Sequence, residues 1–241
     1  AQGGSSSPAT TILSEPLHNQ MVETLSAGHQ AILFLNRRAY SPFLLCRECG
    51  HTWQCQHCSV ALSFHQKVNI LKCHHCNYQE PAPRFCPQCN GMRINPLGIG
   101  TQRVEEMVRE TFPGVRVARL DRDVAQKKGA LEEILAQFRT GEIDVLVGAQ
   151  MVAKGLDFPN VTLVGVIAAD TSLNLPDFRA SERTFQLLSQ VAGRAGRGVL
   201  PGHVIVQTFN PNHEAIVRAR DHDYYGFYEK LLLERREAGY P

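Results

Sequence analysis

VLVGAQMVAKGLDFPNVTLV, residues 145–164, decides the fold of this chain. An apolar run is followed by a polar turn that carries Lys154, Gly155 and Asp157, and a second apolar run completes the stretch. Short apolar runs bounded by turn residues are typical of strands buried within a sheet. The stretch therefore predicts two strands joined through a turn of unusual polarity.

The same alternation extends over most of the chain. Apolar runs that we assign to strands occupy residues 31–35, 115–120, 143–148, 161–169 and 203–209. One pattern of helical period precedes the first run, at residues 14–27, and three lie between later runs, at residues 104–111, 131–138 and 181–192. Parallel neighbours in a sheet need crossover connections of helix length. The sequence therefore predicts an α/β fold, a parallel sheet with helices on both faces.

Composition places the chain among soluble globular proteins. Its 241 residues are 43% hydrophobic and 20% charged, with a net charge of +2, which excludes an intrinsically disordered tract. No apolar run approaches the 18 or so residues of a membrane span. Residues 1–10 resemble flexible linker and lack the pattern of a signal peptide. We expect a cytoplasmic protein with no membrane partner.

All eight cysteines lie between Cys46 and Cys89, in four Cys-x2-Cys hooks. Without an export signal, disulfides are disfavoured because the cytosol keeps thiols reduced. Four tandem hooks do not match a thioredoxin-like redox site. Two hooks supply the four thiolates of a closed, tetrahedral zinc site. The segment 44–95 is therefore predicted to be a small domain held by two structural Zn²⁺ ions, interrupting the sheet after its first strand.

Three pairings of the four hooks are possible. The gap of 14 residues between the second and third hooks is closest to the usual zinc-ribbon gap of about 15 to 20 residues. We therefore pair the inner hooks with each other and the outer hooks with each other. Five histidines near the hooks are alternative ligands, but eight cysteines already fill eight positions. The predicted sets are Cys46, Cys49, Cys86, Cys89 and Cys55, Cys58, Cys73, Cys76.

The most informative functional motif is QVAGRAGRG, residues 190–198. Arg194 and Arg197 lie three residues apart near a helix end, and Gln190 precedes Arg194 by about one turn. Guanidinium groups at this spacing suit the charge that grows on a γ-phosphate during hydrolysis. The alternative interpretation is a solvated basic helix end.

With these motifs in order, the chain resembles the second RecA-like lobe of superfamily 2 helicases. AILFLNRRAY before the hooks, PLGIGTQRVEE after them and LDRDVAQKKGALEEIL narrow the resemblance to the PriA family, the primosomal replication-restart DNA helicases. The resemblance implies that Arg194 and Arg197 face ATP phosphates, supported by Gln190. It implies that Gly155 and Asp157 couple the nucleotide to DNA.

The resemblance also implies an activity and partners. Family members are ATP-dependent helicases that move 3′ to 5′ on single-stranded DNA at stalled forks in the bacterial cytoplasm, associated with the nucleoid. Their zinc domain contributes to unwinding and to docking of other primosome proteins, and single-strand-binding protein is a further partner. A second hypothesis from another class is a zinc-ribbon module that binds nucleic acid or protein without using ATP.

Two positions depart from the family pattern, and two motifs are missing. Ala149 stands where the family's motif V, which ends at Gly155 and Asp157 here, usually has a threonine. Arg37 and Arg38 are followed by Ala39, where the family commonly has a glycine. No GxxxxGK[ST] loop and no DExH box occur in these 241 residues, so ATP and Mg²⁺ would require a separate first lobe. We expect a fragment that cannot hydrolyse ATP alone. Its expected parts are a linker (1–10), a discontinuous helicase lobe (11–43 and 96–210), the double-zinc insert (44–95) and a helical lead-in to a C-terminal domain (211–241).

Overall fold

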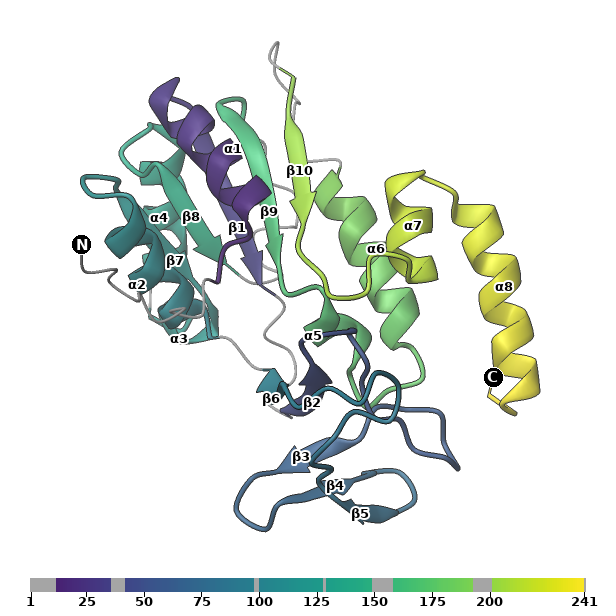
Figure 1. Cartoon of the computed structure of the whole chain (residues 1–241). Coiled ribbons are helices and arrows are strands. Elements are labelled where there is room, and N and C mark those ends of the chain that lie inside the picture. The colour runs from purple at the N-terminus through teal and green to yellow at the C-terminus, as the bar shows by residue number, and fades with distance from the viewer. Residues whose placement is uncertain are drawn as a thin grey trace, which may run out of the picture.

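The centre of the molecule is a five-stranded parallel sheet with strand order β10-β9-β1-β8-β7 (Figure 1). The computed structural model describes residues 12–35, 42–97, 100–127, 129–148, 158–192 and 201–240. The predicted parallel α/β fold is confirmed. The sheet strands are β1 (Gln30–Leu35), β7 (Val117–Leu120), β8 (Val145–Gly148), β9 (Val161–Ile167) and β10 (His203–Val206).

Alternate residues of the central strand β1 point to opposite faces of the sheet. Ala31, Leu33 and Leu35 pack on the face covered by α1 (Glu15–Ser26) and α2 (Thr101–Thr111). Buried side chains on these helices complete that layer; they are Leu17, Met21, Val104, Met107 and Val108. Since every residue of β1 is buried, its sequence is apolar almost without interruption.

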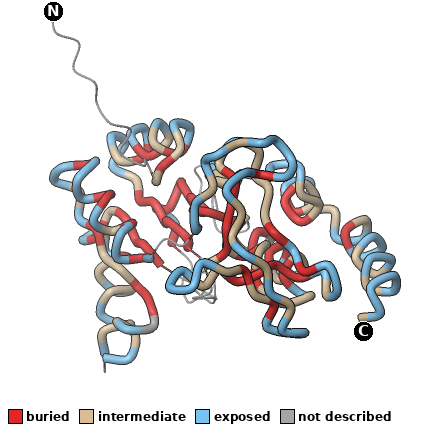
Figure 2. Tube along the Cα trace, turned by 60° about the horizontal axis from the view of Figure 1, so that its bottom comes forward, coloured by how far each residue is buried: buried red, intermediate tan, exposed pale blue. Residues whose placement is uncertain are grey.

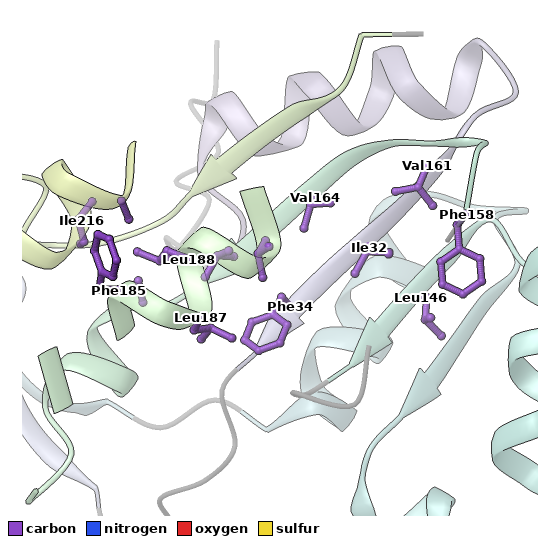
Figure 3. Packing of buried hydrophobic residues seen from close by; sticks show 14 of the residues in the cluster. Ile32, Phe34, Leu146, Phe158, Val161, Val164, Phe185, Leu187, Leu188 and Ile216 are labelled. Carbon is purple, nitrogen blue, oxygen red and sulfur yellow. The ribbon is translucent and has the colours of Figure 1, made fainter. Parts of the chain in front are cut away.

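The opposite face is the larger core. Ile32 and Phe34 of β1 point into it, and Figure 3 shows Phe34 beside Leu187 and Ile32 near Val164. The helices that contribute to it are α4 (Ala130–Arg139), α6 (Ala180–Ala192), α7 (Glu214–Arg220) and α8 (Tyr224–Glu237). Helices on both faces give the doubly covered sheet of a RecA-like lobe.

Phe138 anchors α4 to the sheet and offers a test of this core. Its side chain is 0% exposed and its ring meets that of Phe158 edge-on, with centroids 4.8 Å apart. We expect Phe138→Ala to lower the free energy of unfolding by about 3–5 kcal/mol, because the cavity adds to the lost burial. Urea unfolding of the chain measures the loss. Glu133→Ala, at an exposed position of the same helix, should change stability by less than about 0.5 kcal/mol. An equal effect of both changes would contradict this account of the core.

Local sequence patterns missed two short helices, α3 (Arg122–Ala125) and α5 (Asp170–Leu173). The stretch 211–241, which was expected to be helical, contains α7 and α8. Tyr224, Phe227, Tyr228 and Leu231 have the spacing of one face of a helix, and α8 spans them. However, only Phe227 is buried, while Tyr224 and Tyr228 are 56% and 46% exposed. A tyrosine tolerates exposure because its hydroxyl can be solvated.

The Cys-rich segment follows β1 and forms two small antiparallel sheets. One pairs β2 (Phe43–Cys46) with β6 (Ile94–Leu97), and the other has the order β3 (Ser63–His65), β4 (Ile70–Lys72), β5 (Gln79–Pro81). We call residues 43–97 the insert. It lies beyond the carboxyl ends of the parallel strands (Figure 1).

The insert has its own small core, separate from those of the large sheet. Its buried members are Leu44, Trp53, Cys55, Val60, Leu62, Leu71 and Cys73. In Figure 2, where the insert comes toward the viewer, its outer loops are largely exposed. Such a core is too small to stabilise the segment by apolar burial alone. In the described part of the chain, no helix has the length and apolar character needed to cross a membrane.

Candidate metal centres and their contacts with the sheet

The four hooks share one backbone conformation. In each, the residue after the second cysteine has a positive φ and donates its N–H to the carbonyl of the first cysteine. These residues are Gly50, Ser59, Asn77 and Asn90, with φ between 49° and 78° and N···O distances of 2.8–3.1 Å. Glycine and asparagine adopt this left-handed conformation at low cost. The turn directs both sulfurs of a hook to one side, which is the geometry a shared cation requires.

A second hydrogen bond closes each hook. The N–H of the first cysteine donates to the carbonyl five residues further on, at 2.8–2.9 Å in all four cases. The four donor–acceptor pairs are Cys46 to His51, Cys55 to Val60, Cys73 to Tyr78 and Cys86 to Gly91. The repeat of one structure four times explains why the Cys-x2-Cys spacing is constant along the segment.

The structure brings the hooks together in the nested grouping expected from the 14-residue gap. Within each set of four, all sulfur atoms lie within 4.8 Å of one another. The first cysteine of every hook is buried and the second is partly or fully exposed. The outer set is Cys46, Cys49, Cys86, Cys89, and the inner set is Cys55, Cys58, Cys73, Cys76.

These donor sets fit Zn²⁺. Sulfur–sulfur distances are 3.6 Å for Cys46–Cys89 and for Cys49–Cys86. A tetrahedral ion with Zn–S bonds of about 2.3 Å requires sulfurs about 3.8 Å apart. The separations are far too long for disulfides, whose sulfurs lie about 2.05 Å apart. Four thiolates leave no position for water, so an ion held here would be structural.

The protonation of the thiols shows why a cation suits each set. Burial raises the pKa of Cys73, but backbone N–H groups of Cys76 and His75 hydrogen-bond to its sulfur and lower the pKa to about 7. Burial and the neighbouring thiols of Cys76 and Cys73 raise the pKa of Cys58 to about 12. In the outer set, the pKa of Cys46 is likewise lowered to about 7 and the pKa of Cys89 is raised to about 12. In each set one thiol ionises readily and another resists ionisation, because negative charge accumulates when no positive ion is present.

The outer set contacts the lobe formed by the parallel sheet through the turn of its first hook. A Cβ added at Gly50 would lie 2.5 Å from the carbonyl oxygen of Phe209. Phe209 is fixed in turn by buried Asp170, which accepts its backbone N–H at 3.0 Å and the Thr208 hydroxyl at 3.1 Å. Burial raises the pKa of Asp170 despite these hydrogen bonds. The backbone of the hook therefore packs directly on backbone that leaves β10.

The inner set contacts the lobe at two other points. The Tyr240 hydroxyl, beyond the end of α8, donates to the carbonyl of Cys58 at 2.6 Å. The Tyr240 ring stacks on Phe178, with centroids 4.7 Å apart. His75 Nε2 donates to the carbonyl of Pro176 at 3.0 Å. Residues 176 and 178 lie just before α6, the helix that leads into QVAGRAGRG.

Gly50→Ala tests the contact between hook and lobe. Gly28 provides the control, because its φ of +73° is close to the +78° of Gly50 but no atom lies within 4 Å of its added Cβ. We expect Gly28→Ala to cost about 1–2 kcal/mol from its left-handed conformation alone. Gly50→Ala should cost about 1–3 kcal/mol more, from the clash with Phe209. Urea unfolding measures both changes; equal losses would show that the contact contributes nothing.

The residues expected at the ATP site and at its coupling to DNA lie mostly outside the described residues. Among these are Ala149, Gly155 and Asp157 of the 145–164 stretch, and Arg194 and Arg197. Arg37, Arg38 and Ala39, where the sequence departs from the family pattern, also lie outside. Gln190 is described: it is exposed in the last turn of α6, directly before the arginine pair. The two stretches follow β8 and α6, elements of one core.

Sequence reasoning missed the lobe residues that receive the insert. Asp170 follows a strand and gave no motif, and Tyr240 lies 182 residues from Cys58. The repeated Gly or Asn after three of the four hooks was a signal available in the sequence. It indicates the left-handed turn that closes each hook.

Comparisons with known proteins agree with this architecture. The model of the helicase conserved C-terminal domain matches residues 84–199, and that of the PriA DNA helicase Cys-rich region matches residues 55–81, which contain the inner set. The chain is 51% identical over 231 residues to replication restart protein PriA of Bacillus subtilis, covering 96% of this chain and 29% of that protein. It is 46% identical to the PriA protein of Treponema pallidum, covering 95% and 35%.

Two solved structures are similar to the chain at low identity and low TM-score. The Pyrococcus furiosus Hef helicase domain is 19% identical with a TM-score of 0.35, covering 80% of this chain and 24% of that chain. The DUF1998 helicase MrfA bound to DNA and AMPPNP is 15% identical with a TM-score of 0.41, covering 89% and 20%. Family membership therefore depends on the sequence matches alone.

The parallel sheet, the two cysteine sets and the matched models define the class: this is the C-terminal lobe of a superfamily 2 helicase, interrupted by a Cys-rich region. The chain belongs to the PriA family of replication restart proteins. It spans about a third or less of the length of the relatives it matches.

Proposed function

We propose that this chain is the second motor lobe and zinc-binding region of an ATP-dependent DNA helicase that acts in replication restart. The observation that carries the proposal is a pair of four-cysteine sets docked on a RecA-like sheet, beyond the carboxyl ends of its strands, where β8 leads into the predicted motif that contains Gly155 and Asp157. In α/β sheets, ligands bind beyond the carboxyl ends of the strands.

The two metal ions are proposed to be structural Zn²⁺, held by the eight cysteines. When bound, they supply positive charge that neutralises each set of thiolates and links two hooks. We propose that the lobe comprises residues 11–43 and 96–210, the zinc region residues 44–95, and residues 211–241 a helical connection to a further domain. The hook contacts with Phe209, Pro176 and Tyr240 fix the zinc region against the lobe.

ATP and Mg²⁺ are proposed to bind between this lobe and a first lobe that supplies the phosphate-binding loop. Arg194 and Arg197 would contact the phosphates, and Gln190 would support them from the last turn of α6. Gly155 and Asp157 would couple nucleotide to DNA. This division of roles follows the order of the motifs and the family resemblance, and gives the chain one wall of an ATP site.

The whole protein is proposed to translocate 3′ to 5′ on single-stranded DNA at forks in the bacterial cytoplasm, associated with the nucleoid. Its proposed partners are forked DNA, other primosome proteins and single-strand-binding protein. Support comes from the replication restart proteins that the chain resembles over nearly all its length.

Comparison of the chain with the whole protein tests the proposal. The purified, zinc-loaded chain should show no ATP hydrolysis stimulated by single-stranded DNA, because it has no GxxxxGK[ST] loop. The whole protein should hydrolyse ATP and displace a strand from a duplex with a 3′ single-stranded tail. Turnover by the chain alone would overturn the assignment of half an active site. Equal unwinding of duplexes with 5′ and 3′ tails would overturn the proposed polarity.

A further inference from the structure

A groove of about 860 Å³ crosses the insert. One wall is formed by residues 49–56, which join the first two hooks, and the other by residues 80–88, which run from β5 into the fourth hook. Asn210, in the connection between β10 and α7, also lines the groove. The proposed zinc ions would hold both walls, because each wall contains cysteine ligands of the sets described above.

Aromatic rings and prolines provide the apolar part of the lining. Trp53 is 8% exposed, and the ring of His51 meets it edge-on, with centroids 4.8 Å apart. Phe85 is 51% exposed and makes no ring contact with another aromatic side chain among the described residues. The rigid prolines of the second wall are Pro81, Pro83 and Pro87. An exposed ring beside a preformed apolar wall is suited to receive a side chain from another molecule.

The polar part of the lining is almost uncharged. Gln54, Gln56 and Gln88 offer amides that both donate and accept hydrogen bonds, as peptide groups do. None of the residues that line the groove is a lysine or arginine, and Glu80 is the acidic one; Arg84, between Pro83 and Phe85, is exposed but is not part of the lining. The Tyr78 hydroxyl donates to Glu80 Oε2 at 2.7 Å and so orients the carboxylate. A polyanion needs cationic contacts, so this lining disfavours a nucleic-acid backbone.

We propose that this groove binds an extended peptide segment of a partner protein, in which an aliphatic or proline residue lies next to a lysine or arginine. The apolar side chain packs against Phe85 and the exposed edge of Trp53. The glutamine amides pair with the peptide backbone, and the carboxylate of Glu80 binds the cation. Aromatic-lined and proline-lined grooves commonly bind extended peptides in this way. The inference rests on the proposed zinc binding, since the hooks shape both walls.

Selection from a phage-displayed library of random decapeptides tests the proposal. The zinc-loaded chain is the target, and its Phe85→Ala variant is used for counter-selection. We expect enriched peptides to place a lysine or arginine beside an aliphatic or proline residue. Fluorescence anisotropy with the selected peptide, labelled with fluorescein, should show that Phe85→Ala weakens binding by about 30-fold, as for a central aromatic residue of an interface.

Three comparisons make the result specific. Glu80→Gln should weaken binding of the basic peptide but not of its analogue with glutamine in place of the basic residue. Tyr225→Ala, at a 78% exposed aromatic side chain on α8, should bind like the unchanged chain. Elemental analysis should find two zinc ions in every variant; metal loss in the unchanged chain would instead contradict the zinc sites.

Two outcomes would overturn the proposal. One is a selection that yields no peptide able to distinguish the chain from Phe85→Ala. The other is tighter binding of a labelled oligo(dT) than of any selected peptide, with dependence on Phe85. That second result would assign the groove to single-stranded nucleic acid.

Discussion

Removal of both metal ions is expected to unfold the insert while the parallel sheet keeps its structure. Binding of a structural Zn²⁺ contributes about 10–16 kcal/mol in small zinc-dependent domains. The core of the insert has few large side chains, among them Trp53, Leu62 and Leu71, and cannot replace that contribution. The sheet is held by two separate cores on its own faces. Hydrogen exchange before and after chelation should show lost protection in residues 47–93 and retained protection in β1, β8 and β9.

Single substitutions test which residues hold the two zinc ions. Elemental analysis should find two zinc ions in the unchanged chain and one after Cys73→Ser, since Cys73 belongs to the inner set. His57→Ala should keep two, because His57 lies within a hook but outside both donor sets. A Cys73→Ser chain that retained two ions would show that Cys73 is not a ligand. Unchanged protection of the insert after full chelation would contradict a structural role for the metal.

Arg197→Ala in the whole protein should lower the rate of ATP hydrolysis by about 10³-fold or more, the range typical of arginine fingers. The reason is that negative charge on the transferred phosphoryl group peaks in the transition state, where a fixed guanidinium stabilises it. Arg197→Lys should restore little, because an ammonium lacks the planar fork of donors. Steady-state ATPase assays at saturating DNA measure the effect.

The control for this prediction is Arg220→Ala. Arg220 has a side chain that is 72% exposed and pairs with the adjacent Asp221. Its loss should leave hydrolysis within about twofold, since exposed ion pairs contribute little. DNA binding, followed by anisotropy with a labelled oligonucleotide, should survive both changes. If Arg197→Ala left hydrolysis intact, the finger role would be refuted.

Much of the fold could be predicted because it depends on local patterns. The strand at residues 31–35 is apolar throughout since both faces of β1 are covered, and the helix at 131–138 has Phe138 at its predicted core position. The grouping of the hooks followed from a single gap length. Each of these features is encoded within a few tens of residues.

The contacts that position the insert could not be predicted. The Tyr240–Cys58 hydrogen bond and the approach of Gly50 to Phe209 join residues more than 150 positions apart in the sequence. Such contacts depend on the complete fold and leave no periodic pattern along the chain. Exposure in α8 could not be predicted either. Tyr224 and Tyr228 have the spacing of an apolar face, but both remain exposed.

The short ribbon of β2 and β6 has a consequence for how such a chain is assembled. Cys46 and Ile94 are direct partners in this antiparallel pair, as are Phe43 and Leu97, so the two strands that lead out of and back into the lobe are adjacent. For the sheet, residues 47–93 are equivalent to one hairpin loop, and loop closure depends only weakly on loop length. A motor lobe can therefore acquire, exchange or lose the entire metal-binding module at this hairpin without altering the order of its strands.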